Sequence, residues 1–444
     1  MIQVLLDQQR MIEQLRAEIE QLKRRGSAAP FSKGTNKPDP KAPGRKPGQG
    51  YFRFRGEPAG VAGAEPIQVP AGIGCPNCGG ALGEAVQEIV STTDIPLTGC
   101  GEVRRYRVEI RKCPQCGKSV RGQHPDIAAG QQGATAHRVG ARARAAAQLL
   151  HYGHGVPVRK VPAILEELTG IRLTQGAITQ DAMKQVAGAV GARYAALRES
   201  VRKQTVIHTD DTGWRVQGKT AFLMAFVNAS LSVYQVRSRH RNEEVRELAP
   251  ADFAGVMVCD RGKSYDAEEL QSVSQQKCQA HLLRNAAEVT QGKTGRARQF
   301  SQRLKDLLRQ ALALGAKKNE MDAVRYGERI QKLEGALSWH LRRRYLRDAD
   351  NQKLLDGVGL QHDRGRLLRF LKEEGLEPTN NRAERDLRPA VIARKVSHCS
   401  RNVAGARAFE AFTSVIQTLR KIDPATMAAE LVRLMNNPPA IASP

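Results

Sequence analysis

The sequence predicts an α/β protein whose sheet segment is followed by a long helical segment. Between residues 204 and 285, short apolar runs follow the two-residue period of strands, whereas residues 286–375 follow the period of helices. Asp210 and Asp260 stand close behind two of the apolar runs. Strand and helix patterns that succeed each other in this way are typical of α/β folds, and they place both acids at strand ends.

The composition favours a polyanionic partner. The 444 residues, enough for about three domains, include 70 Lys and Arg against 45 Asp and Glu, which gives a formal charge of +25. Such an excess favours nucleic acid, although a merely basic protein would show the same balance. No apolar stretch approaches the ~20 residues of a membrane helix, and the N-terminus lacks a signal-peptide core. We therefore expect a cytoplasmic, nucleoid-associated protein without a membrane partner.

Residues 1–25 predict one amphipathic helix. Leu5, Ile12 and Ile19 fall at the a positions of a heptad repeat, with Leu15 and Leu22 at d positions. Ile at a and Leu at d favour a parallel two-stranded coiled coil, so we expect a homodimer or a larger assembly. The repeat is short for a stable coil, and a helix packed on its own chain is the alternative.

Residues 26–56 predict an extended basic linker. Pro alternates here with Gly, Lys and Arg, so no core can form. Arg45 and Lys46 lie in the segment 44–50, which fits along a DNA phosphate backbone or in a minor groove. A solvated tether fits the same composition equally well.

Residues 57–126 predict a zinc ribbon. Cys75 and Cys78 form one Cys-x-x-Cys pair, and Cys113 and Cys116 form another, each followed by Gly. Four thiolates complete the tetrahedral shell of Zn²⁺, and the residues before the second pair alternate as a β-strand does. Because four protein ligands leave no open coordination position, we expect one structural Zn²⁺ rather than a catalytic one.

Residues 127–203 predict a helical domain. Val161–Leu168 and Gln175–Lys184 read as two helices joined by a turn at Gly170. This outline is that of a helix-turn-helix DNA-binding motif. The second helix is poor in Arg at its start, where base contacts would come, so ordinary helical packing is an equal alternative.

Residues 204–285 predict the first part of a catalytic core, in the order strand, strand, strand, helix, strand. A parallel pairing of the first and fourth strands would bring Asp210 and Asp260 together, as in a ribonuclease-H-like sheet. The predicted elements are strands at Val206–His208, Thr220–Ala229, Leu231–Arg237, Val256–Cys259 and Lys277–His281, and a helix at Arg241–Leu248.

The rest of the chain is helical and basic. Residues 286–375 predict an all-helical insertion, whose basic face is either a DNA contact or a solvated surface. Residues 376–435 predict the last part of the core and C-terminal helices, followed by a tail at 436–444. Glu384 lies among cations that we take as candidate DNA contacts, because a surface salt bridge needs fewer of them. These are Arg382, Arg385, Arg388, Arg394 and Lys395.

Asp210, Asp260 and Glu384 supply the ligands that hard divalent cations require. Mg²⁺ and Mn²⁺ prefer oxygen ligands, and Asp and Glu provide charged ones. Two such ions ~4 Å apart can activate an attacking oxygen and stabilise a leaving one in phosphodiester chemistry. The sequence therefore predicts a catalytic site for two Mg²⁺ or Mn²⁺ ions that acts on DNA.

Three motifs resemble the insertion-sequence 66 family of bacterial DDE transposases. They are Asp210-Asp-Thr-Gly-Trp214, Cys278-Gln-Ala-His281-Leu-Leu-Arg284 and Asn380-Asn-Arg-Ala-Glu384-Arg-Asp-Leu-Arg388. Their order and spacing make the resemblance specific. The heptad helix, the zinc knuckles and the Gly-Arg-Lys-Pro linker are also similar to the family's layout, so the resemblance covers nearly the whole chain.

The resemblance implies an enzyme that binds the ends of an insertion sequence and uses Asp210, Asp260 and Glu384 as its metal-binding triad. Water would cut at the element ends, and the freed 3′-hydroxyl would attack target DNA. Double-stranded DNA is then the partner, with small accessory proteins encoded by the element. Two other functions fit the residues less well: a zinc-ribbon DNA-binding regulator derived from a transposase, and a ribonuclease-H-like structure-specific nuclease.

The resemblance also implies supporting roles for Cys278, His281 and Trp214. The chain departs from the family pattern at two places. Asp211 stands where the family commonly has Glu, and the segment after Asp260 is looser than the family's, which leaves Asp266 as a rival for the second acid.

Overall fold

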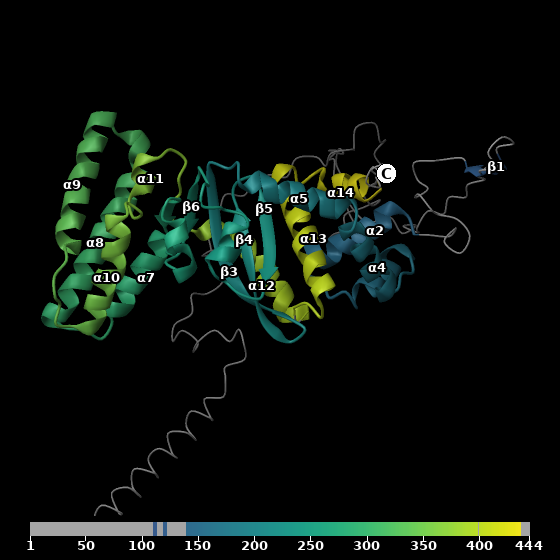
Figure 1. Ribbon diagram of the computed structural model, residues 1–444, viewed down its shortest axis with the longest axis horizontal. Coiled ribbons are helices and arrows are strands. Elements are labelled where there is room, and N and C mark those ends of the chain that lie inside the picture. The colour runs from purple at the N-terminus through teal and green to yellow at the C-terminus, as the bar shows by residue number, and fades with distance from the viewer. Residues whose placement is uncertain (1–109, 113–118, 122–138, 398, 437–444) are drawn as a thin grey trace, which may run out of the picture. The chain divides into compact units, whose positions relative to one another are not determined.

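The computed structural model describes residues 110–112, 119–121, 139–397 and 399–436 (Figure 1). The predicted heptad helix, the basic linker with Arg45 and Lys46, and all four zinc-knuckle cysteines lie outside the described residues. Two short strands, β1 (Ile110–Lys112) and β2 (Ser119–Arg121), pair antiparallel and flank the second Cys-x-x-Cys in the sequence.

A mixed five-stranded sheet forms the centre of the described fold, in the order β5-β4-β3-β6-β7 (Figure 1). Antiparallel pairing joins β3, β4 and β5, whereas β6 and β7 run parallel to β3. The predicted parallel pairing of the first and fourth strands is confirmed, and the α/β fold is compatible with a ribonuclease-H-like core. The strands are β3 (Val206–Val216), β4 (Lys219–Val227), β5 (Ser232–Arg237), β6 (Val256–Cys259) and β7 (Ser274–Lys277).

The first strand is longer than predicted. The polar run after His208 suggested a strand end, but β3 continues to Val216 because β4 pairs antiparallel with it from His208 onward. A tight hairpin joins the two strands at Gln217 and Gly218, both of which have positive φ, as two-residue hairpin turns require. Asp210 therefore lies inside β3, although two residues beyond the end of its parallel pairing with β6.

The fifth strand was predicted at the wrong place. It ends at Lys277, and the helix α7 (Gln279–Thr290) begins just after Cys278, where we expected the strand to continue. The side chains of Gln275, Gln276 and Lys277 are polar yet completely buried. Their partners are tertiary, such as the carbonyl oxygen of Leu367 for Gln276, so hydrophobic periodicity does not reveal this strand.

Helices cover both faces of the sheet, and β4 shows the alternation that this requires. Met224 and Phe226 pack in a core with α5 (Ala189–Val201), α13 (Val403–Ile422) and α14 (Met427–Asn436), whereas Leu223 and Ala225 pack in a second core with α12 (Asn381–Ser397).

Strand β5 lies at the edge of the sheet, where α13 covers it. Its backbone amides at Ser232 and Tyr234 donate to the hydroxyl oxygens of Thr418 and Ser414, and that of Val236 donates to Glu410. The exposed edge that could otherwise pair with another chain is thereby closed.

The N-terminal helices of the described fold include both predicted ones. They are α3 (Val161–Thr169) and α4 (Gln175–Val186), and the first ends at Gly170 with positive φ. Before them, α2 (Ala141–Gln148) continues through a π-helical turn, and the three helices share a small apolar core.

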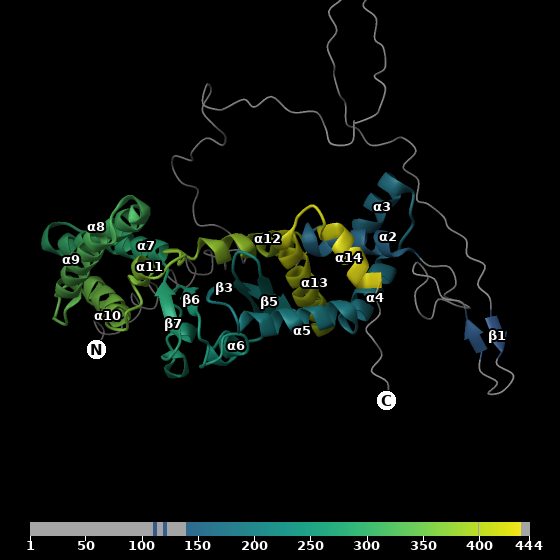
Figure 2. The ribbon, with the colours of Figure 1, turned by 90° about the horizontal axis from the view of Figure 1, so that it is seen from above.

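A group of helices packs beyond β6 and β7, with its own apolar core that includes Val256 and Val258 of β6 (Figure 2). Within the described residues, no helix is long and apolar enough to cross a membrane. Besides α7, the helices of this group are α8 (Gly295–Ala316), α9 (Ala323–Leu341), α10 (Ala349–Asp363) and α11 (Arg369–Lys372).

Candidate active site

Asp210 and Asp260 lie side by side at the carboxyl end of the parallel β3–β6 pair. The ladder ends with His208 opposite Val258, and two further residues along each chain lead to the two acids. Because parallel strands advance in the same direction, equal steps from a paired position lead to neighbouring positions. The negative charge of Asp260 contributes to the raised pKa of Asp210, as this proximity requires.

Glu384 reaches the same place from α12. Asn380 precedes this helix and is completely buried, and its side-chain amide donates to the carbonyl oxygen of Thr209, the neighbour of Asp210, at 2.8 Å. One helical turn later, the backbone amide of Glu384 donates to the carbonyl oxygen of Asn380. The start of α12 is thus fastened to β3 where Asp210 lies, although 173 residues separate the two acids in sequence.

The electrostatics show that the three acids interact. Burial raises the pKa of Asp210 to about 7, and the charges of Asp260, Asp211 and Glu384 also raise it, while the backbone amide of Asp211 lowers it. Desolvation and neighbouring like charge both disfavour the ionised carboxylate. A bound cation would offset both effects on Asp210.

The donor set fits Mg²⁺ or Mn²⁺. Within the described part of the chain, no three His, Cys, Asp or Glu side chains are grouped to enclose one ion by themselves. Mg²⁺ does not require such a cage, because it is commonly held by one or two carboxylates and completes its shell with water and substrate phosphate. Asp210 and Asp260, on neighbouring strands, are a carboxylate pair of the kind that such an ion uses.

Asp266, the rival for the second acid, is engaged elsewhere. Its carboxylate pairs with Lys277 at 3.0 Å and with Arg366 at 3.2 Å, and it accepts a hydrogen bond from Gln361 at 3.0 Å. Both cations are almost completely buried, so Asp266 compensates charge in the interior. The geometry brings Asp260, rather than Asp266, beside Asp210.

Cys278 and His281 contact the segment that carries Glu384. The sulfur of Cys278 accepts a hydrogen bond from the backbone amide of Asn380 at 3.1 Å, and Nε2 of His281 lies 3.8 Å from Oε1 of Glu384. Both side chains lie at the start of α7, which leaves the sheet next to β7. They are placed to support the third acid.

Sequence patterns did not reveal the partner of Asp211. Nδ1 of His240 lies 3.0 Å from the Asp211 carboxylate, and the His240 ring packs edge-on against Tyr265, whose hydroxyl hydrogen-bonds with Thr209. Asp211 and His240 lie 29 positions apart in the sequence, and no hydrophobic periodicity links them. Asn380 was missed as a site residue as well, although it stands in the same motif as Glu384.

The predicted basic contacts on α12 lie in three different surroundings. Arg385, Arg388 and Lys395 are exposed and share one face of the helix. Arg382 pairs with Glu377. Arg394 departs from the expectation, because its side chain is buried and donates to the Thr212 hydroxyl at 2.9 Å, so that it fastens α12 to β3 instead of standing on the surface.

Trp214 supports the hairpin rather than the acids. Its indole is buried, donates to the Ser400 hydroxyl at 3.1 Å and packs on Phe409 of α13 with ring centroids 4.7 Å apart. Trp214 lies four positions after Asp210 on the strand, a distance of about 13 Å along it.

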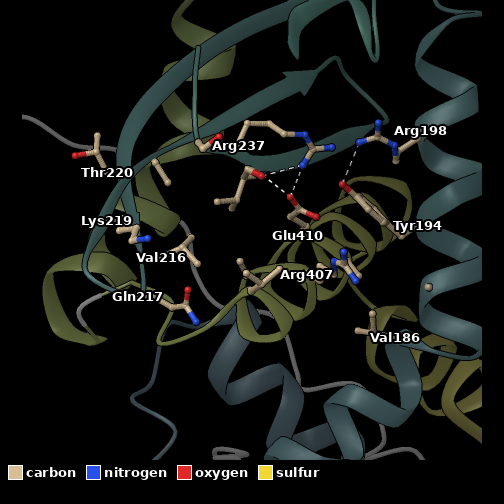
Figure 3. A pocket seen from close by; sticks show the side chains of 17 residues that line it. Val186, Tyr194, Arg198, Val216, Gln217, Lys219, Thr220, Arg237, Arg407 and Glu410 are labelled. Carbon is tan, nitrogen blue, oxygen red and sulfur yellow. Dashed lines mark hydrogen bonds and ion pairs between the residues drawn. The ribbon is translucent and has the colours of Figure 1, made fainter. Parts of the chain in front are cut away.

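A cavity of about 680 Å³ lies at the far end of the same hairpin (Figure 3). Arg237 and Glu410 pair across it at 2.8 Å, and Val216 lines it from β3. None of the three acids lines this cavity, and Val216 is about 20 Å along the strand from Asp210. The acids therefore lie outside this cavity, just beyond the carboxyl end of the β3–β6 pairing.

The sequence matches one family model, described as the Transposase IS66 family, over residues 137–408. The matched range covers more than half of the chain and contains the whole sheet, the helical group α7–α11 and all three acids. A search among curated proteins finds no match. The chain belongs to the IS66 family of transposases.

Proposed function

We propose that the protein is a DDE transposase that binds the ends of an insertion sequence, cleaves the DNA there and joins it to a target. The observation that carries this proposal is the convergence of Asp210, Asp260 and Glu384 from three separate elements of a transposase-family chain. The order and direction of the five strands support a ribonuclease-H-like core for this chemistry.

Each acid has a distinct mechanical role in the proposal. Asp210 and Asp260 stand on adjacent strands and provide a rigid pair, whereas Glu384 stands in the first turn of a helix, where the helix dipole favours a negative side chain. Mg²⁺ or Mn²⁺ ions held by these carboxylates would activate the attacking oxygen and stabilise the leaving one. Asn380, Cys278 and His281 hold the carboxylates in position.

The exposed face of α12 is proposed to hold the DNA strand next to the acids. Arg385 and Arg388 lie one and four residues after Glu384, so phosphates bound by them would pass beside the carboxylate. Such contacts fix register without reading sequence. The specific recognition of element ends then falls to other parts of the chain, and the helices α3 and α4 are candidates.

Two proposals concern the N-terminal residues. Cys75, Cys78, Cys113 and Cys116 are proposed to hold one structural Zn²⁺, which the antiparallel pairing of β1 with β2 around the second pair supports. The heptad helix at residues 1–25 is proposed to join two copies of the chain, with element-encoded accessory proteins as further partners.

Cleavage and joining of candidate element ends in Mg²⁺ or Mn²⁺ test the function. Glu384→Gln should abolish both reactions while leaving end binding intact, because the amide keeps the shape but not the charge. Glu430→Gln, which alters an exposed ion pair on α14, is the matched control and should stay active. Cleavage by Glu384→Gln at the wild-type rate would reject the site, and cleavage without joining would favour the structure-specific nuclease.

A further inference from the structure

Two large aromatic side chains stand exposed around the C-terminal end of α9. Trp339 is 66% exposed and Tyr345 is 83% exposed. Aromatic residues usually bury most of their surface, and clustered exposed ones mark interaction sites. Both lie in the helical group beyond β7, away from the three acids and from the cavity of Figure 3.

An arginine lies over the Trp339 ring, and others are close to both rings in the sequence. The guanidinium of Arg342 lies 4.0 Å from the centroid of the Trp339 ring and donates to the Trp339 carbonyl oxygen at 2.8 Å. This contact orients the indole from one side, and the exposed fraction shows that much of the ring still meets solvent. Arg343 and Arg347 are also exposed. We call Trp339, Arg342, Arg343, Tyr345 and Arg347 the aromatic–arginine surface.

Nearby acids do not neutralise this surface. Asp348 and Asp350 follow it in the sequence, but both pair with Lys293, at 2.5 and 2.9 Å. The neighbouring His340 lies in a positive field, since Arg344, Arg303 and Arg342 all act to lower its pKa, although burial is the larger cause. An anion is therefore the complementary partner.

The base of the surface is rigid. His340 is buried, stacks on Phe300 of α8 with ring centroids 4.6 Å apart, and hydrogen-bonds to the Phe300 carbonyl oxygen at 3.0 Å. The guanidinium of Arg344 lies over the Phe300 ring, 5.5 Å from its centroid. Trp339 is thus presented on a fixed helix end, which lowers the entropy lost when a ligand stacks on it.

We propose that Trp339 and Tyr345 stack on unpaired bases of the DNA substrate while Arg342, Arg343 and Arg347 contact the adjoining phosphates. This inference rests on the proposed function. An indole face with positive neighbours fits a base and its phosphates, and stacking tolerates any base because each has a π-face. A fully paired duplex hides those faces, so the surface distinguishes unpaired from paired DNA.

The helix α7 connects the neighbourhood of the acids with the base of this surface. It begins just after Cys278, which contacts Asn380, and ends at Thr290, whose hydroxyl lies 3.0 Å from that of Ser301, next to Phe300 in the sequence. Twelve helical residues span about 18 Å, which equals about five stacked nucleotides at 3.4 Å each.

Tryptophan fluorescence of the full-length protein tests this directly. The chain has two Trp residues, of which Trp214 is 3% exposed, so a base that stacks can quench Trp339 alone. The probes are a 20-base-pair duplex, the same duplex with one central unpaired dT, and single-stranded oligo(dT). We expect quenching by the last two probes and little by the paired duplex.

Affinity gives the second measurement, by fluorescence anisotropy of labelled probes. Trp339→Ala should weaken binding of the duplex with the unpaired base about 5- to 150-fold and leave binding of the paired duplex unchanged. Trp339→Phe should keep most of the affinity. Val324→Ala is the control, because Val324 is 73% exposed on the opposite end of α9 and should have no effect.

The outcomes separate the two proposals. If the wild type binds all probes and Trp339→Ala binds them equally well, the stacking surface is rejected and the transposase function is untouched. If no probe binds the wild type at all, the proposed function fails first. If Trp339 fluorescence shifts to shorter wavelength with protein concentration in the absence of DNA, the surface is an interface between proteins, and the inference is overturned.

Discussion

Asp210 is an acid of the proposed site, and its surroundings shift the protonation of its carboxylate. Burial raises its pKa to about 7, above the value near 4 of an unfolded chain. The folded state therefore holds more protons between about pH 4 and pH 7, and without metal this group destabilises the fold as pH rises through that window. A cation bound above pH 7 reverses the penalty.

A thermal-shift experiment follows from this balance. Mg²⁺ should raise the Tm of the wild type, and the increase should grow from pH 6 to pH 8 because the metal competes with the proton on Asp210. Asp210→Asn should lose the Mg²⁺ response and unfold at a higher temperature than the wild type at pH 8 without metal. Asp252→Asn, which alters an exposed carboxylate, should behave as wild type. An unchanged Mg²⁺ response in Asp210→Asn would contradict the assignment.

Asn380 is a positioning residue, since it touches the strand of Asp210 and the helix of Glu384 but neither carboxylate. Asn380→Ala should lower the rate of end cleavage about 10- to 100-fold and raise the Mg²⁺ concentration needed for half-maximal rate. Its DNA affinity should not change. The adjacent, exposed Asn381 offers the matched control, Asn381→Ala. A cleavage rate and Mg²⁺ dependence like those of the wild type would leave Asn380 a purely structural role.

At the residue scale, the sequence singled out the three acids together with Cys278 and His281, whereas the contact made by Asn380 was not predictable. Asp210 and Asp260 each follow an apolar run, and Glu384 stands among arginines in a recognisable motif. The hydrogen bond from Asn380 to Thr209 joins positions 171 residues apart and is visible only once β3 and α12 meet. Arg394 was wrongly predicted to contact DNA. Composition alone does not distinguish an arginine on the surface from one that fastens a helix to a strand.

Among the elements, strands whose polarity reflects tertiary contacts were the hardest to predict. The all-apolar β6 was placed correctly, because a strand covered on both faces reads as a continuous apolar run. The strand β7 was shifted by about three residues, since its buried Gln and Lys side chains find their partners in distant segments. The end of β3 was misjudged because its partner β4 was not part of the local pattern.

The contact between α8 and α9 makes a prediction about pH. Burial lowers the pKa of His340 to about 4, so the folded state excludes a proton that the unfolded chain accepts near pH 6.5. Stability is then full above pH 6.5 and is lost as pH falls toward 4. Thermal unfolding of His340→Gln, which can still donate to the Phe300 carbonyl oxygen, should show a smaller loss of Tm over this window. Equal losses would refute the effect.

The whole molecule carries a formal charge of +25, and its effect on DNA binding is measurable. Each phosphate contact contributes about −0.9 to the slope of log affinity against log salt. The double variant Arg385→Ala with Arg388→Ala should reduce the magnitude of that slope by about 2, measured by anisotropy between 50 and 200 mM salt. Arg433→Ala on α14 removes an exposed arginine already paired with Glu430 and should leave the slope unchanged. An unaltered slope in the double variant would remove α12 from the DNA interface.

At the scale of the whole molecule, three short sequence motifs were enough to identify the family. The fold explains why so few residues carry that information. The strand order brings the first and fourth strands together, and α12 returns to β3 after the helical group α7–α11. The motifs are therefore the parts of the chain that meet, while the segments between them are free to vary in length. The aromatic–arginine surface lies outside these motifs, and no hydrophobic periodicity in the sequence indicated it.

The central claim is that Asp210, Asp260 and Glu384 form one cation site. Crystals of the protein soaked with Mn²⁺ test it most directly, because anomalous scattering locates the ion without reference to activity. We expect Mn²⁺ within roughly 2.1 Å of carboxylate oxygens from these three residues, with Asp266 still paired to Lys277. Ordered carboxylates with no Mn²⁺ beside them, or an ion held by Asp266 instead, would contradict the account.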